Sequence, residues 1–448
     1  MRKHNRERGW KSMGVEVMRG TTDKLQTEAP PASSPTAVQS FPSQDERKPE
    51  NRRIGVCIIV ENNPVPFDRR VWQEARALAG AGYQVSVICP KGLGFTESRE
   101  TLEGIEIYRH RAWEASGRLG YFIEYPWALV CEFLLALRVY ADTRFRILQA
   151  CNPPDTIFLI ALFFKLFGVR FVFDHHDLNP ELYEARFRRK DLFYRLACWA
   201  ERLTFRTADV ILCANESFRE IAFARGRVLP QRSFVVRSCP DLSAFRPQPA
   251  QPELKQGRKY LVVYVGVMGP QDGLGLLLES IHYLVKAQNR SDTLFVLIGP
   301  GSELPKLRAI ATERDLDPVV RFTGPIYGKG VHDYLATADV GVVPDPSSVF
   351  NDKLTMIKTL EYMAYAVPVV LYDLTEGRRT AADAALYAKG NDPIDFAGQI
   401  ARLLDSEALR RQLGECGRRR VEQHLNWDVE RQELLSAYKA VLQSDHAS

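Results

Sequence analysis

The feature that most constrains the fold is a regular alternation of apolar strands and helices that begins near Arg53. Residues 54–60 form an apolar, β-branched run, and a loop at 61–68 leads into a helical pattern at 69–79. Near-continuous apolar strands separated by helices are typical of a parallel sheet covered on both faces. We therefore predict a doubly wound, Rossmann-like α/β domain over residues 52–245. Its further strands are expected at 85–89, 105–109, 147–150, 171–174, 210–214 and 234–236.

The same alternation restarts after a Pro- and Gln-rich stretch, residues 246–258, which we interpret as a linker. A second Rossmann-like domain is predicted over 259–428, followed by a C-terminal helix and tail at 429–448. The helix itself is expected at about 428–442 and can pack on either domain. Ligands of such folds bind at the carboxyl ends of the strands, so two facing domains would enclose a cleft. The strands of the second domain are expected at 260–265, 294–298, 319–322, 340–343, 369–372 and 385–387.

Charge is unevenly distributed between the two predicted domains. Residues 52–245 carry 27 Lys and Arg against 22 Asp and Glu, whereas residues 259–428 carry 19 against 22. A basic first half and an acidic second half argue against a nucleic-acid clamp. They fit a first domain that faces anionic lipid or an anionic acceptor.

The cysteines and the N-terminal segment bear on the compartment. The eight cysteines show no C-x-x-C spacing, and most lie in apolar runs, which predicts buried reduced thiols and a cytoplasmic protein. Residues 1–51 are polar and rich in Pro and Ser, which is typical of a disordered tail rather than a signal peptide. Apolar runs at 126–139 and 156–168 are too short to span a membrane.

The most informative segment is residues 350–370, FNDKLTMIKTLEYMAYAVPVV. It is predicted to be a helix opened by Asn351 or Asp352 that carries Lys353, Lys358 and Glu361. A helix start and lysines favour bound phosphate, and a carboxylate can hold sugar hydroxyls, so the segment suits a nucleotide-sugar donor. The alternative is a solvated charged helix face.

Small residues follow three strands of the second half. Gly266 and Gly269 lie after 260–265, and Gly299 lies after 294–298, where glycine allows close approach of an anion to the backbone. Tyr327 follows 319–322 and is a candidate for stacking on a base. Turns needed only for packing, and an ordinary exposed aromatic ring, would produce the same pattern.

Two clusters in the first half are candidates for acceptor and catalytic roles. His176 and Asp177 follow the strand at 171–174, where one imidazole facing the cleft would bond a sugar hydroxyl or phosphate. Arg69 and Arg70 open the first helix and are candidates for binding an anionic acceptor. A capped helix start and ordinary exposed arginines are the alternatives. No metal site is predicted.

Residues 186–206 combine many arginines with an apolar stripe that contains Leu192, Phe193, Leu196, Trp199 and Leu203. A basic amphipathic helix of this kind can lie on a membrane surface. The same stripe can equally be the core-facing side of a helix.

Taken together, these segments resemble family 4 glycosyltransferases with the two-domain GT-B architecture, from about Arg53 to the C-terminus. Among them, the chain is most similar to bacterial enzymes that build capsular, exopolysaccharide or O-antigen units. The resemblance rests on DRRVWQEARAL, FDHHDLNPELY, VRSCPDL, YVGVMGPQDG and NDKLTMIKTLEYMAYAVPVV.

The resemblance implies retaining transfer from a nucleotide sugar with no metal or other cofactor. It places Glu361 on the donor ribose, Lys358 near the diphosphate, and Gly266 and Gly269 under the phosphates. It also places His176 and Asp177 near the transferred sugar.

The chain departs from the family pattern at three places. Lys353 stands where a second carboxylate is usual, so it is expected to pair with phosphate or with an acidic sugar. The Arg and Lys common after the glycine loop are missing from GPQDG, which leaves Lys353 and Lys358 to neutralise the diphosphate. Ala366 stands where a helix-ending glycine is common.

The expected protein is thus a glycosyltransferase on the inner face of the plasma membrane with a lipid-linked or glycan acceptor. Two other functions remain compatible with the sequence. One is a nucleotide-sugar epimerase of the same fold, and the other is a membrane-docked assembly subunit without catalysis.

Overall fold

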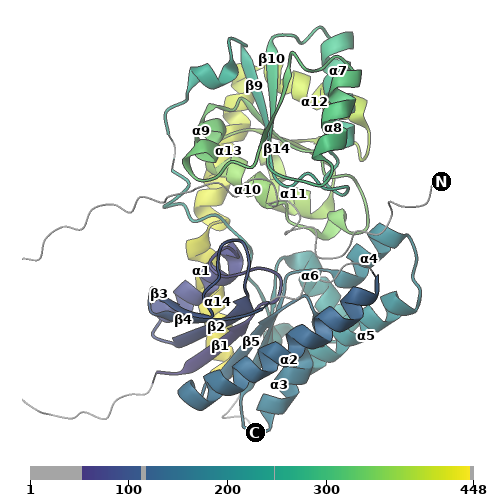
Figure 1. The fold of residues 1–448 in the computed structure, drawn as a ribbon. Helices are drawn as coiled ribbons and strands as arrows, with labels where there is room; N and C mark the ends of the chain where they lie inside the picture. The colour runs from purple at the N-terminus through teal and green to yellow at the C-terminus, as the bar shows by residue number, and fades with distance from the viewer. Residues whose placement is uncertain (1–52, 112–117, 247, 444–448) are drawn as a thin grey trace, which may run out of the picture.

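The computed structural model describes residues 53–111, 118–246 and 248–443, and it forms two α/β domains (Figure 1). The predicted fold class is confirmed: each domain is built on a mainly parallel sheet with helices on both faces. The disordered tail predicted for residues 1–51 lies outside the described residues.

The first domain contains an eight-stranded sheet in the order β3-β4-β2-β1-β5-β6-β7-β8. Every neighbouring pair is parallel except β3 and β4. The predicted strands are all present, but β3 was missed. The strands are β1 (Gly55–Ile59), β2 (Gln84–Pro90), β3 (Arg99–Leu102), β4 (Ile105–His110), β5 (Ile147–Cys151), β6 (Arg170–His175), β7 (Val210–Cys213) and β8 (Ser233–Val235).

Alternate residues of the central strands bury against helices on opposite sides of this sheet. On β1, Val56 and Ile58 share a core cluster with α1 and the last helix, whereas Cys57 and Ile59 share one with α2, α3 and α5. The helices of this domain are α1 (Arg69–Gly80), α2 (Arg118–Thr143), α3 (Phe158–Lys165), α4 (Asn179–Phe187), α5 (Leu192–Thr207) and α6 (Glu216–Ile221).

The second domain contains a six-stranded, fully parallel sheet in the order β11-β10-β9-β12-β13-β14. Its strands are β9 (Tyr260–Val265), β10 (Thr293–Ile298), β11 (Val320–Gly324), β12 (Val340–Val343), β13 (Val369–Tyr372) and β14 (Ala385–Ala388). Its helices are α7 (Leu274–Ala287), α8 (Leu304–Glu313), α9 (Lys329–Thr337), α10 (Ile357–Ala364), α11 (Thr375–Ala381), α12 (Pro393–Asp405) and α13 (Glu407–His424).

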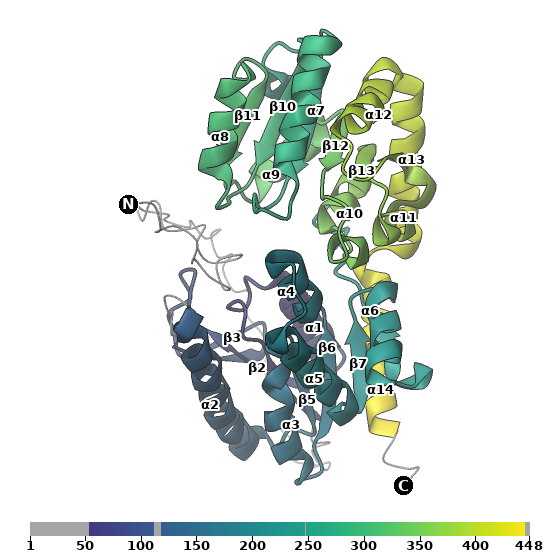
Figure 2. The same ribbon diagram turned by 90° about the vertical axis from the view of Figure 1, so that its right-hand side faces the viewer.

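The last helix, α14 (Trp427–Gln443), returns to the first domain (Figure 2). Leu434 and Tyr438 belong to the same core cluster as β1 and β2, and the Tyr438 hydroxyl donates to Gln149 at 2.5 Å. The chain therefore passes between the domains twice, once after β8 and once between α13 and α14.

Short helical turns connect several elements, namely η2 (Asp155–Ile157), η3 (Ala222–Gly226), η4 (Pro230–Arg232), η5 (Pro252–Lys255), η6 (Asn351–Lys353) and η7 (Ala382–Ala384). Across the described ranges, none of the helices combines the length and apolar character that crossing a bilayer requires.

Candidate functional site

The glycine loops of the second domain interlock at the ends of β9 and β10. Gly266 has φ +154° and Gly299 has φ +136°, a range that L side chains rarely adopt. A Cβ atom on Gly299 would lie 1.9 Å from the carbonyl oxygen of Gly266. The backbone packing alone therefore demands glycine at position 299, and the same packing holds the 266–269 loop in place.

Lys358, on α10, lies beside this loop. Its Nζ contacts Asp345 at 2.8 and 3.1 Å and lies 4.9 Å from the centre of the Tyr264 ring. A Cβ atom on Gly266 would be 3.5 Å from the Lys358 Cε, so the lysine lines the glycine loop. Burial acts to lower the pKa of Lys358, but Asp345 and Asp272 outweigh it and the pKa is raised. The ammonium group is thus firmly charged.

Asp272 places a second carboxylate at the glycine loop. Its Oδ2 accepts the backbone N–H of Gly269 at 2.8 Å. Burial raises the pKa of Asp272 to about 6, although the nearby Lys358 opposes the shift. A backbone amide and a lysine that suit an anionic ligand are therefore already engaged by internal carboxylates.

Glu361 lies one helical turn beyond Lys358 on α10 and meets the first domain. Its Oε1 is 3.4 Å from Arg69 Nη1. Burial raises the pKa of the Glu361 carboxyl, and Arg69 and Lys358 oppose that shift. The structure thus brings Glu361, a candidate for donor binding, into contact with Arg69, a candidate for acceptor binding.

The predicted start of the helix that carries Lys353 is wrong. The helix does not open at Asn351 or Asp352, because these residues and Lys353 form the short turn η6, and α10 begins only at Ile357. The Asp352 carboxylate caps α11 instead, accepting from the backbone N–H of Thr375 at 2.8 Å. Lys353 still lies at the domain junction, since its carbonyl accepts from the Asn215 side chain at 2.9 Å.

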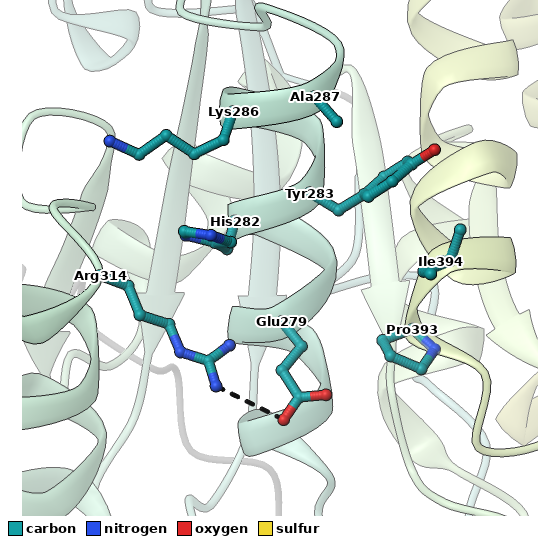
Figure 3. A pocket seen from close by; sticks show the side chains of 8 residues that line it. All are labelled: Glu279, His282, Tyr283, Lys286, Ala287, Arg314, Pro393 and Ile394. Carbon is teal, nitrogen blue, oxygen red and sulfur yellow. Dashed lines mark ion pairs between the residues drawn. The ribbon is translucent and has the colours of Figure 1, made fainter.

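Tyr327 lies between β11 and α9 and is 55% exposed. Its predicted stacking role stays a prediction. A separate hollow on the second domain is lined by residues of α7 and α12 together with Arg314, whose guanidinium lies 3.6 Å from Glu279 (Figure 3). None of the predicted site residues lines this hollow.

In the first domain, His176 and Asp177 follow β6 and are held by Asn152. The backbone N–H groups of both residues donate to Asn152 Oδ1, at 2.9 and 3.1 Å. His176 Nδ1 lies 3.0 Å from Asp174, which leaves Nε2 outside this pair. Burial acts to lower the pKa of His176, but Asp174 outweighs it and raises the pKa to about 8. The imidazole is therefore mostly protonated at neutral pH.

His175 faces the opposite way from His176, as expected for adjacent strand residues. It is fully buried against Phe205 and Phe218, and its Nε2 lies 3.2 Å from Glu201. Of these two histidines, only His176 is thus placed to contact a ligand.

Arg70 is buried and paired inside the first domain, and its predicted acceptor role stays a prediction. Its guanidinium contacts Asp174 at 2.6 and 3.0 Å, lies 3.3 Å from Glu74 and donates to the carbonyl of Val236. The side chain is 8% exposed, against 76% for Arg69. The Arg70 guanidinium makes its hydrogen bonds inside the first domain. Of the two neighbouring arginines, Arg69 is therefore the one that faces outward.

Sequence reasoning missed several residues of this arrangement. Asp345 stands directly after Pro344 at the end of β12, and Asn152 follows β5 in the same way. A polar side chain at the carboxyl end of a buried strand is the signal that identified His176 and would have identified both. The remaining missed residues are Tyr264, Asp272, Asp174 and Asn215.

Two groups in the described ranges place potential metal-ligating atoms within 4.8 Å of one another: Cys151, Asp174 and His176, and the buried trio Glu61, His110 and Glu132. In the first group, Asp174 is already neutralised by Arg70.

Two family models match the chain, one in each domain. Residues 68–239 match the glycosyl transferase 4-like domain, and residues 259–406 match glycosyl transferases group 1. The boundary between the two matches coincides with the passage from the first sheet to the second.

Curated relatives are similar over less than their full length. A D-inositol 3-phosphate glycosyltransferase of Thermomonospora curvata is 29% identical over 229 residues, which cover 47% of this chain and 52% of the relative. A putative teichuronic acid biosynthesis glycosyltransferase of Bacillus subtilis is 24% identical over 216 residues, which cover 46% and 51%. The chain spans about half the length of the curated relatives it matches.

Solved structures resemble the chain over most of both molecules. Sucrose-phosphate synthase from Thermosynechococcus elongatus has a TM-score of 0.72 at 19% identity and covers 88% of this chain and 100% of its own. The Anabaena protein HepE, solved with UDP and glucose, has a TM-score of 0.64 at 12% identity and covers 86% and 100%. At such identities the likeness shows the fold. With the two family models, it places this chain among the GT-B glycosyltransferases, as a family 4-like member.

Proposed function

We propose that the protein is a retaining, metal-independent glycosyltransferase. It would move a sugar from a nucleotide-sugar donor to a lipid-linked or glycan acceptor in the synthesis of a cell-surface polysaccharide such as a capsule, exopolysaccharide or O-antigen. The observation that carries the proposal is the grouping of Lys358, Glu361 and the Gly266–Gly269 loop at the domain junction, opposite Arg69.

The donor diphosphate would bind where internal carboxylates now engage the cationic groups. Lys358 would exchange Asp345 for a phosphate oxygen, and the backbone N–H of Gly269 would exchange Asp272 for another. The Glu361 carboxylate would accept hydrogen bonds from the ribose hydroxyls once Arg69 has moved away from it. Each exchange releases an internal carboxylate, Asp345 or Asp272, whose charge then lies close to the bound diphosphate.

The chemistry would rest on stabilising the departing diphosphate with protein cations. Lys358 provides a fixed charge, and His176, with a pKa raised to about 8 by Asp174 against its burial, provides a second one from the first domain. The acceptor hydroxyl would lose its proton late in the reaction to a phosphate oxygen of the donor. Lys353, at the junction, is a third cation for the phosphate or for an acidic sugar.

The acceptor would be presented by the first domain. Arg69 is exposed and stands at the start of α1, at the junction with the donor side. We place the protein on the cytoplasmic face of the membrane, where lipid-linked acceptors and nucleotide sugars meet. The excess of cations in residues 52–245 supports this placement.

A thermal-shift panel of nucleoside diphosphates and their sugars tests the donor assignment. A ligand present at 100 times its Kd adds about 2.7 kcal/mol to the free energy of unfolding, a clear rise in Tm. Transfer of label from the matching donor into a lipid extract, with retained anomeric configuration and in the presence of EDTA, then tests the reaction. Absence of any nucleotide effect on Tm would exclude the donor site.

The same samples separate the other two functions. An epimerase converts the nucleotide sugar without an acceptor, whereas a transferase needs one. A non-catalytic assembly subunit would bind no donor at all, and the neutralised state of Lys358 is the observation that keeps this alternative in view.

A further inference from the structure

Most of the large exposed apolar side chains lie on one side of the first domain. In the described ranges, 18 large hydrophobic residues are exposed, and 11 of them belong to α2, α3 with the two residues after it, and α5. We call this set the apolar face. It consists of Trp127, Val130, Leu134, Leu159, Leu162, Leu166, Phe167, Leu192, Phe193, Leu196 and Trp199.

The three helices form one continuous surface. Phe133 of α2 packs against Phe163 of α3 with ring centres 4.9 Å apart, and α3 packs against α5. Both ribbon views show α2, α3 and α5 side by side on the outer side of the first sheet (Figures 1 and 2). On each helix the exposed apolar residues recur at spacings of three and four, so each contributes one stripe.

This arrangement bears on the core-facing interpretation of the amphipathic segment at 186–206. Trp199 is 58% exposed, and Leu192, Phe193 and Leu196 are exposed beside it, while α5 buries Glu201, Thr204 and Phe205 instead. The apolar stripe of α5 therefore faces outward, and the core-facing alternative is wrong for these four residues.

The segment that contributes α3 and α5 to the apolar face exposes basic charges alone, whereas α2 exposes both Arg138 and Asp142. Between residues 156 and 206, every exposed charged side chain is basic, namely Arg186, Arg188, Arg189, Lys190, Arg195, Arg202 and Arg206. The carboxylates of that segment are buried or half-buried, and Asp191 and Glu201 are engaged with Tyr183 and Arg225. An apolar surface edged by arginines matches a bilayer whose headgroups are anionic.

We propose that the apolar face is a docking surface for an anionic lipid bilayer. This inference deepens the proposed function and rests on its lipid-carried acceptor. The basic stretch at 186–190 begins in the last turn of α4, and His176 and Asp177 lie just before the start of that helix. A nine-residue helix spans about 14 Å, which is short enough for a headgroup-bound acceptor to reach the candidate site.

The test is cosedimentation of the full chain with vesicles of phosphatidylglycerol and phosphatidylcholine. We expect binding to the mixed vesicles, weak binding to pure phosphatidylcholine, and loss of binding as NaCl rises from about 0.1 to 0.5 M. Trp199→Glu and Leu166→Glu should each lower partitioning at least about tenfold. Ile394→Glu on α12 is the matched control, because Ile394 is 56% exposed on the other domain and should leave binding unchanged.

Nucleotide binding and circular dichroism of the same variants complete the experiment. Trp199→Glu should keep its fold and its nucleotide affinity, since Trp199 is exposed and the ion-pair partners of Lys358 and Glu361 lie outside α5. Failure of nucleotide binding with intact vesicle binding would remove the proposed function but leave the docking surface. Wild-type protein that ignores anionic vesicles, or that dimerises through this face until Trp199→Glu makes it monomeric, would overturn the proposal.

Discussion

The two domains use charged residues at their strand ends in opposite ways. In the first domain, Arg70, Asp174 and Glu74 form a buried network in which Arg70 bridges both carboxylates. In the second domain, Lys358 and Glu361 each have one ion-pair partner, Asp345 inside the domain and Arg69 across the domain junction. A buried network of several bonds fixes a structure, whereas a single ion pair beside the glycine loop or across the junction can be exchanged for a ligand. Of the neighbouring residues Arg69 and Arg70, Arg70 belongs to the buried network and Arg69 makes the contact across the junction.

The largest effect should come from the buried network. Arg70→Ala leaves Glu74 without its buried cation and Asp174 with His176 as its remaining cationic partner, which should lower the free energy of unfolding by about 3–5 kcal/mol. Arg69→Ala is the matched control from the next position and should change it by less than about 0.5 kcal/mol. Urea denaturation of both variants measures the difference. Equal decreases in the free energy of unfolding for the two variants would contradict the different roles of Arg69 and Arg70.

Glu361→Ala should reduce sugar transfer at least about 100-fold, because the carboxylate that holds the donor ribose is lost. Glu279→Ala on α7 is a suitable control, since Glu279 is a half-exposed carboxylate paired with Arg314. Initial rates at saturating acceptor give the comparison. Unchanged turnover in the Glu361 variant would contradict its donor role.

Asp272→Asn should strengthen nucleotide-sugar binding about tenfold at pH 7.5, because a negative charge next to the diphosphate is removed. Burial raises the pKa of Asp272 to about 6, so the wild-type carboxyl is mostly charged at pH 7.5 and mostly neutral at pH 5. Wild-type affinity should therefore improve as the pH falls through 6, whereas the variant should show little change.

Calorimetry at pH 5, 6 and 7.5 measures this dependence. Asp317→Asn, in the connection between α8 and β11, is the control and should behave like the wild type. Parallel pH profiles for wild type and Asp272→Asn would show that the carboxylate does not compete with the donor.

The smallest effect concerns the end of α10. Ala366 has φ +55°, the left-handed region in which a Cβ atom is strained, so alanine carries a conformational cost at this position, where a helix-ending glycine is common. Ala366→Gly should raise the free energy of unfolding by about 1 kcal/mol without changing transfer. Ala364→Gly, inside the same helix, should lower it by a similar amount or more, and a gain there would refute the argument.

The sheets were predictable because their strands are buried on both faces and therefore apolar throughout. The strands β9, β12 and β13 match the predicted ranges at both ends. β3 was missed because Arg99–Leu102 is a polar edge strand paired on one side only. An edge strand exposed to water carries no apolar run to detect.

The site was harder to predict because charged residues of the same types occur both in buried structural networks and in contacts that a ligand can replace. Asp352 resembles a cap for the following helix, yet it caps α11, a contact made only after folding. Arg70 differs from Arg69 by its place on the buried stripe of α1, four residues before Glu74, and this spacing was the available signal. Pairings such as Arg69 with Glu361 join residues 292 positions apart, which no local pattern reveals.

A crystal structure with the donor found by the thermal-shift panel would test the central claim most directly. The account predicts diphosphate oxygens about 3 Å from Lys358 Nζ, a ribose hydroxyl on Glu361, and Arg69 released from that carboxylate. A diphosphate bound away from the Gly266–Gly269 loop, with Lys358 still on Asp345 and Glu361 still on Arg69, would contradict it.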